Sequence, residues 1–153
     1  MKKQTIENGS QNNDWKTPPH LLKIIRDEFG KYFDPCPYQS EFDGLTFPWK
    51  KVNYINPPYS TKLKSQFIHK SIEEFKKGNT CIILIPASTE TRDFKALWEV
   101  AKEIRFLHKR VKFHGYNVKG EWTTTKTGQS GSMLVILKKH NQKKPKISLL
   151  NHI

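Results

Sequence analysis

The sequence predicts one α/β domain with a mostly parallel central sheet and helices on both of its faces. Short apolar runs alternate along the chain with segments whose apolar residues recur at helical spacing. One continuous apolar run, residues 80–86, is typical of a strand buried on both faces of a parallel sheet. The length of 153 residues is that of one ordinary domain, large enough to bury a single core.

The first structured element is a helix over residues 18–29. Residues 1–13 are polar and rich in Asn, Gln, Gly and Ser, which favours a flexible N-terminal arm. Thr17 is a suitable N-cap, prolines occupy the first turn, and Gly30 follows the last apolar position as a stop. The apolar residues between these signals share one helical face.

Two short strands and a second helix follow. Residues 32–33 and 52–55 carry the aromatic and β-branched residues that strands prefer, with an irregular segment between them. Residues 62–75 have helical spacing, and the strand at 80–86 comes next. Ligands of α/β sheets bind outside the carboxyl ends of the strands. Three residues fall at such ends: Asp34, Asn56 and Pro86.

The C-terminal half continues the alternation of helix and strand. We expect a helix over residues 92–102, a strand at 104–107 and the last strand at 133–137. Residues 115–131 are polar and predict a mobile loop placed to touch a ligand. Residues 139–153 predict a basic C-terminal tail.

Charge indicates the class of partner. Lys and Arg number 27 against 14 Asp and Glu, which gives a net charge of +13 and a pI near 9.8. Such a field attracts polyanions, so nucleic acid is the expected partner. Five of the lysines lie within residues 138–146, and the single domain expected over residues 14–138 is basic without that run. Scattered surface lysines are the alternative explanation.

Cysteine usage and hydropathy indicate the cytoplasm. Cys36 and Cys81 lie far apart without a CxxC partner, so neither a disulfide framework nor a zinc site is expected. No apolar run approaches the roughly 20 residues that cross a bilayer, and the N-terminus lacks the apolar core of a secretion signal. We therefore expect a cytoplasmic protein with no metal and no membrane partner.

The segment Asn56-Pro57-Pro58-Tyr59-Ser60 gives the sharpest functional prediction. An exocyclic amine on a conjugated ring is a poor nucleophile, and an enzyme that alkylates it must accept both of its N–H protons. The side-chain oxygen of Asn56 is one acceptor and the carbonyl of Pro57 the second, in a loop stiffened by prolines. The Tyr59 ring offers a flat surface for stacking a base. A chain stop at the two prolines, with Tyr59 in the core, is the structural alternative.

Six short stretches form an ordered set: Trp15-Lys16-Thr17-Pro18, Phe33-Asp34-Pro35-Cys36, Asn56-Pro57-Pro58-Tyr59-Ser60, Leu84-Ile85-Pro86-Ala87-Ser88-Thr89, Arg110-Val111-Lys112-Phe113 and Gly131-Ser132-Met133. In this order and spacing they resemble the bacteriophage-type DNA N-6-adenine methyltransferases, a Dam-like family dependent on S-adenosylmethionine. The resemblance covers most of the chain, and the second and third stretches are its cofactor and catalytic segments. It implies a compact Rossmann-like methyltransferase fold.

The resemblance also implies how S-adenosylmethionine binds. Asp34 is expected to bind the ammonium group of the cofactor, the Thr17–Pro18 backbone its methionine part, and Asp43 its adenine amine. A turn role is the alternative for both carboxylates, since Asp34 precedes a proline and Asp43 a glycine. The residues assigned to the cofactor are Trp15, Thr17, Pro18, Asp34, Pro35, Cys36 and Asp43.

The cofactor segment departs from the usual pattern of this fold. The Gly-rich turn after the first strand is absent, with Cys36-Pro37-Tyr38 in its place, and no clear acid ends a second strand to bind the ribose. Cys36 is interpreted as a small packing residue, because amine methylation needs no thiol nucleophile. The departure admits a second kind of function, a nucleic-acid-binding or decoy protein without catalysis.

The implied reaction is direct in-line methyl transfer to adenine N6 in double-stranded DNA, which requires no metal. The target adenine is inaccessible inside a duplex, so we expect it to flip out and stack on Tyr59. Phe113 is the candidate for the second stacking surface, or else a core residue. Most isolated lysines are solvated surface, so phosphate contacts depend on clustering beside the cleft. The DNA-contact candidates are Tyr59, Ser60, Lys62, Lys109, Arg110, Lys112, Phe113 and Lys126.

Two further enzymatic functions use the same loop. The first is methylation of a glutamine side chain in a protein, because the carboxamide nitrogen has the same delocalised lone pair as the adenine amine; the positive charge of the chain favours nucleic acid over this substrate. The second is methylation of adenine in RNA, because attraction to phosphates does not depend on the sugar. Within the resemblance we expect a phage-encoded monomer or weak dimer that protects phage DNA in the host cell cytoplasm.

Overall fold

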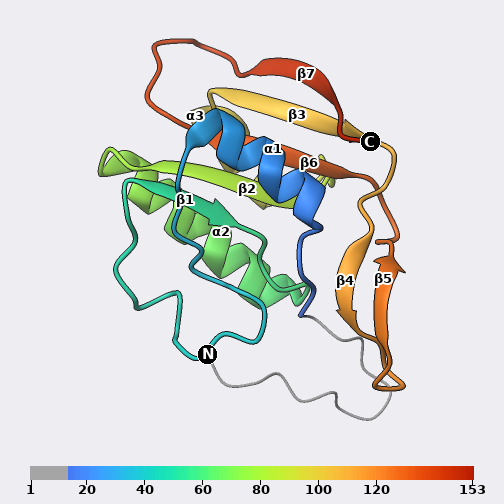
Figure 1. The fold of residues 1–153 in the computed structure, drawn as a ribbon. Helices are drawn as coiled ribbons and strands as arrows, with labels where there is room; N and C mark the ends of the chain where they lie inside the picture. The colour runs from blue at the N-terminus through green and yellow to red at the C-terminus, as the bar shows by residue number, and fades with distance from the viewer. Residues whose placement is uncertain (1–13) are drawn as a thin grey trace.

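The computed structural model describes residues 14–153, so the arm expected over residues 1–13 lies outside the described residues. The elements, in chain order, are α1 (Pro19–Phe29), β1 (Val52–Ile55), α2 (Thr61–Lys76), β2 (Thr80–Pro86), α3 (Arg92–Val100), β3 (Glu103–His108), β4 (Phe113–Tyr116), β5 (Trp122–Lys126), β6 (Ser132–Leu137) and β7 (Lys146–Asn151) (Figure 1). The α/β class and the three expected helices are confirmed. None of the helices in the described part of the chain has the length and apolar character that a membrane crossing demands.

Five strands form the central sheet in the order β1-β2-β6-β3-β7. β1 is parallel to β2, and β3 is parallel to β7, whereas β6 is antiparallel to both of its neighbours. The sheet is therefore mixed, and the expectation of a mostly parallel sheet is not confirmed. The chain leaves β3, turns through β4 and β5 and re-enters the sheet at the same end, so β6 has to run back. An apolar run such as 133–137 carries no signal for strand direction.

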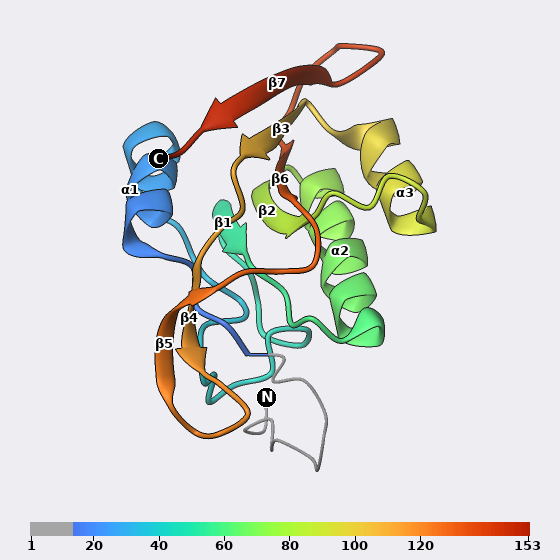
Figure 2. The ribbon, with the colours of Figure 1, turned by 90° about the vertical axis from the view of Figure 1, so that its right-hand side faces the viewer.

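Three strands of the sheet, β1, β2 and β6, are buried on both faces because helices pack on each side (Figure 2). Alternate residues of β2 point to opposite faces, with Ile83 on the side of α2 and α3 and Ile82 on the side of α1. Phe67 of α2 and Leu97 of α3 complete the first cluster, and Leu21 of α1 belongs to the second. This two-sided burial explains why the run at β2 is apolar throughout.

The start of α1 differs in detail from its prediction. Pro18, not Thr17, is the N-cap residue, and it makes no side-chain capping bond. The hydroxyl of Thr17 instead forms a buried 2.6 Å hydrogen bond with the Tyr54 hydroxyl on β1. The end of α1 is as expected, because Gly30 takes a φ of 79°, which glycine adopts without strain. Thr17 therefore joins α1 to the sheet.

The strand expected at 32–33 is reduced to one bridge. Phe33 pairs in parallel with Asn53 of β1, donating from its backbone N–H to Val52 and accepting from that of Tyr54, each at 2.9 Å. Pro35 has no N–H to continue the pairing. The chain therefore leaves the sheet at Asp34, beside the end of β1.

The segment expected to be a mobile loop is largely a β-hairpin of β4 and β5, beside the main sheet (Figure 1). At its turn the side-chain oxygen of Asn117 accepts hydrogen bonds from the backbone N–H groups of Lys119 and Glu121. Gly120 adopts a φ of 77°. The segment thus has more regular structure than a loop, and the signal that was overlooked is the strand preference of a Trp followed by three Thr.

The last strand of the sheet is β7, not the expected strand at 133–137. β7 lies within the segment predicted as a basic tail, and its backbone pairs in parallel with β3 along six residues. The run Ile147-Ser148-Leu149-Leu150, which follows several lysines, is the signal that the charge of the segment obscured. The C-terminal segment thus contributes an edge strand.

Candidate active site

The carboxyl ends of three neighbouring parallel segments define the site. Phe33, β1 and β2 run in the same direction. Asp34 follows Phe33, Asn56 follows β1 and Pro86 is the last residue of β2, so all three lie at the same end of these segments. This placement is the one predicted for ligand-binding residues of an α/β sheet.

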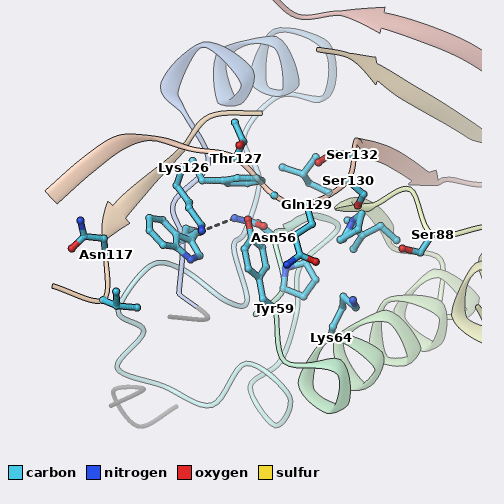
Figure 3. Close-up of a pocket in the computed structure, with 18 residues that line it drawn as sticks. Asn56, Tyr59, Lys64, Ser88, Asn117, Lys126, Thr127, Gln129, Ser130 and Ser132 are labelled. Atoms are coloured by element: carbon cyan, nitrogen blue, oxygen red, sulfur yellow. Dashed lines mark hydrogen bonds between the residues drawn. The ribbon is translucent and has the colours of Figure 1, made fainter. Parts of the chain in front are cut away.

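A cavity of about 400 Å³ opens at this edge (Figure 3). Its walls come from the loop after β1, the end of β2, the start of α2 and the hairpin with the segment that follows it. The volume lies in the usual range for small-ligand sites. Side chains that line it include Trp15, Asn56, Pro57, Tyr59, Lys64, Phe113 and Lys126.

Asn56 is held at both its side chain and its backbone. Its Nδ2 donates a 2.8 Å hydrogen bond to the carbonyl oxygen of Trp15, drawn as a dashed line in Figure 3. The Cys36 thiol donates a 3.2 Å hydrogen bond to the Asn56 backbone carbonyl. Burial raises the pKa of this thiol well above its usual value, so it stays a donor. No described residue donates to the Asn56 Oδ1, so the oxygen is the end of the amide left to accept from a ligand in the cavity.

Tyr59 and Phe113 meet in the cavity as predicted, but their rings are perpendicular. The centroids are 5.9 Å apart and the planes form an angle of 85°. The pair is a T-shaped aromatic contact, so the two rings cannot both lie parallel to one flat ligand. Phe113 is 4% exposed, so it is part of the core and of the cavity wall at once. Burial raises the pKa of Tyr59, and its hydroxyl stays neutral.

Asp34 sits among groups that favour its protonated form. Burial raises the pKa of Asp34, and the neighbouring carboxylate of Asp14 raises it further in the same direction. A 3.0 Å hydrogen bond from the backbone N–H of Cys36 lowers the pKa, but by less than burial raises it, so the pKa lies at about 7. Burial also raises the pKa of Asp14, which accepts from the backbone N–H of Gln39 at 2.9 Å. Two adjacent carboxylates with raised pKa values fit a cationic ligand group, such as an ammonium. Asp14 was not predicted as a site residue.

The other residues assigned to a cofactor are partly engaged in structural contacts. Pro35 packs so closely on Gly44 that a side-chain carbon there would overlap its carbonyl oxygen. The Asp43 carboxylate accepts a 2.9 Å bond from the backbone N–H of Leu45, which is the turn role weighed as its alternative. Trp15 lies in the wall of the cavity beside Asn56. A cofactor contact of Asp43 stays a prediction.

The basic candidates for DNA contact occupy different positions. Lys126 lines the cavity, and exposed Arg110 donates to the Gly128 carbonyl at 3.1 Å in the segment that follows β5. Lys62, Lys109 and Lys112 are exposed outside the cavity wall.

Two residues of α2 refine the prediction. The Ser60 hydroxyl accepts from the backbone N–H of Leu63 as the N-cap. Lys64 lines the cavity and was missed, although it lies one helical turn after Ser60 and so on the same helix face.

Comparison with known proteins identifies the family of the chain. The chain is similar to the crystal structure of a putative class I S-adenosylmethionine-dependent methyltransferase from Listeria monocytogenes, with a TM-score of 0.47 and 18% sequence identity. The match covers 74% of this chain and 41% of the Listeria chain, so the chain spans less than half of that protein. No curated protein matches the sequence. The family model of DNA N-6-adenine-methyltransferase (Dam) matches residues 4–153. The chain therefore belongs to the Dam family, whose cofactor is S-adenosylmethionine.

Proposed function

We propose that the chain methylates N6 of adenine in DNA. The observation that carries this proposal is the orientation of the Asn56 side-chain amide. Its NH₂ group donates a hydrogen bond to the Trp15 carbonyl, so its oxygen can accept a hydrogen bond from a ligand in the cavity. An oxygen in this position accepts from an amine, whereas the reverse orientation would present a donor to a donor. The carbonyl of Pro57, in the same wall, is the second acceptor.

Asn56 and Pro57 act on the nucleophile. When both N–H groups of the adenine amine are hydrogen-bonded to these oxygens, the nitrogen lone pair is drawn out of conjugation with the ring and becomes available for attack. When bound, S-adenosylmethionine supplies a methyl group on a positively charged sulfur. Asp34, supported by Asp14, holds the ammonium group of the cofactor, and the charge pairing lowers the raised pKa values of both carboxyls.

Tyr59 provides the stacking face for an adenine flipped from the duplex, and Phe113, whose ring is perpendicular to that of Tyr59, forms part of the cavity wall. The net charge of +13 supports nucleic acid over a protein glutamine as the substrate. The exposed lysines and Arg110 near the hairpin hold the phosphates. By analogy with phage-type relatives, a monomer or weak dimer of the chain protects phage DNA in the host cytoplasm.

Methyl transfer from tritiated S-adenosylmethionine to unmethylated duplex DNA, followed by nucleoside analysis, tests the proposal. The expected product is N6-methyladenine, and the matched control is Asn56→Ala. If parallel reactions label only RNA or only a glutamine peptide, the substrate is that molecule and not DNA. Calorimetry with S-adenosylmethionine identifies the decoy alternative, because a decoy would bind DNA but not the cofactor.

A further inference from the structure

The hairpin is joined to the segment that precedes α1. Lys16 forms a two-hydrogen-bond bridge with His114 of β4: the Lys16 backbone N–H donates to the His114 carbonyl at 2.7 Å, and the His114 N–H donates back at 2.9 Å. This bridge fixes the backbone next to Trp15 relative to the hairpin.

Both strands of the hairpin also touch the Trp15 side chain. A Cβ on Gly115 of β4 would lie 2.8 Å from Cε3 of the indole, closer than side-chain carbons approach one another, so this position admits only glycine without a shift. From β5, the ammonium of Lys126 lies 5.8 Å from the indole centroid, within reach of a cation–π contact. Trp15 is 6% exposed, which leaves its ring little room to move.

The carbonyl of the same residue fixes the catalytic amide. Trp15 accepts from Asn56 Nδ2 at 2.8 Å, and Figure 3 shows Lys126 reaching toward the same place from the hairpin. A displacement of Trp15 therefore moves the acceptor that orients Asn56. The chain of contacts runs from the hairpin through Trp15 to Asn56.

We propose that the hairpin, through Gly115 and Lys126 packed on Trp15, positions the Asn56 amide for methyl transfer. The proposal rests on the proposed function, since it assigns the accepting oxygen of Asn56 to the reaction. Gly115 is a positioning residue: it touches neither substrate nor cofactor and acts only through Trp15. If the Trp15 carbonyl is displaced, the Asn56 side-chain amide can rotate and present its NH₂ group to the exocyclic amine of the adenine. Both groups are then donors, so no hydrogen bond forms between them.

The test compares Gly115→Ala with Gly131→Ala, a control in which the added carbon meets no atom within 4 Å. We expect Gly115→Ala to lower kcat by roughly tenfold to a hundredfold, because misplacement by about 1 Å far from the reacting atoms has an effect of that size. KM for DNA and the affinity for S-adenosylmethionine should stay within about twofold. The side-chain NH₂ resonances of Asn56 in the ¹⁵N spectrum of the protein without DNA should shift and exchange faster with solvent. Gly131→Ala should leave all four quantities unchanged.

A second substitution separates positioning from general damage. Trp15→Phe removes the indole atoms nearest Gly115 but keeps the backbone carbonyl, so in the Gly115→Ala background it should restore part of kcat and return the Asn56 resonances toward wild type. If Gly115→Ala does not fold, Lys126→Ala at an exposed position should shift the same resonances.

Unchanged Asn56 resonances in the folded variants, or equal kcat for Gly115→Ala and Gly131→Ala, would overturn the proposal. If the wild-type protein methylates no DNA, the proposed function fails. The resonances of Asn56 then still decide whether the hairpin positions its amide.

Discussion

Cofactor affinity should rise with pH through about 7, because Asp34 must ionise to pair with a cation. Burial and the carboxylate of Asp14 raise the Asp34 pKa to about 7 in the free protein, and a bound ammonium group would lower it again. With a pKa near 7, roughly 3% of the Asp34 carboxyls are ionised at about pH 5.5 and about half at pH 7. Since only the ionised form pairs well with the ligand, affinity should increase about 15-fold over that interval. Each ligand bound should release nearly one proton at about pH 5.5 and about half a proton at pH 7.

Isothermal titration with S-adenosylmethionine at several pH values, in buffers of different ionisation enthalpy, measures both the affinity and the released proton. The range should end near pH 7, because the α-amino group of the ligand begins to lose its own charge above that value. Asp34→Asn should bind weakly and with little pH dependence, and Asp14→Asn should move the midpoint of the curve to lower pH. Equal affinity of the wild-type protein at pH 5.5 and 7 would refute the assignment of Asp34 to a cationic ligand.

Three further predictions follow from the site and the charge. Asn56→Ala should lower the single-turnover rate of methyl transfer roughly a hundredfold, the size of effect seen when one hydrogen-bonding group is lost at other reacting centres. Calorimetry should find the affinity for the cofactor nearly unchanged. A fully active Asn56→Ala variant would contradict the role of the Asn56 side-chain oxygen. DNA affinity measured by anisotropy should fall with a log–log salt slope of about −0.9 per phosphate contact, whereas the melting temperature should hardly change. Tyr59→Phe should keep most activity and Tyr59→Ala lose it, since stacking uses the ring and not the neutral hydroxyl, and 2-aminopurine at the target position should brighten on binding only if the base flips.

Local signals in the sequence predicted the elements that place the site. The uninterrupted apolar run of β2 marks a strand buried on both faces, and the polar residue that follows β1 could be assigned to a strand end before any contact was known. Asn56 and Asp34 could therefore each be assigned to a strand end, and the pairing of Phe33 with β1 in the structure brings both to the same end of the sheet.

Contacts between distant segments could not be predicted in the same way. The hydrogen bond from Asn56 to Trp15 joins residues 41 positions apart, and it depends on the register of Lys16 against His114. The direction of β6 depends on where the preceding hairpin returns the chain, which hydrophobic periodicity does not encode. β7 was missed because a strand preference over four residues was outweighed by the lysines that precede it.

The antiparallel β6 has a consequence for how members of this fold can diversify. β3 and β6 are neighbours in the sheet, so the chain between them begins and ends at adjacent points on one edge. A connection of this kind can lengthen, shorten or change its residues without altering the order of the strands, as surface connections in general tolerate insertions. The tip of the hairpin, residues 117–121, can therefore be exchanged, whereas His114, Gly115 and Lys126 have to be kept for their contacts with Lys16 and Trp15.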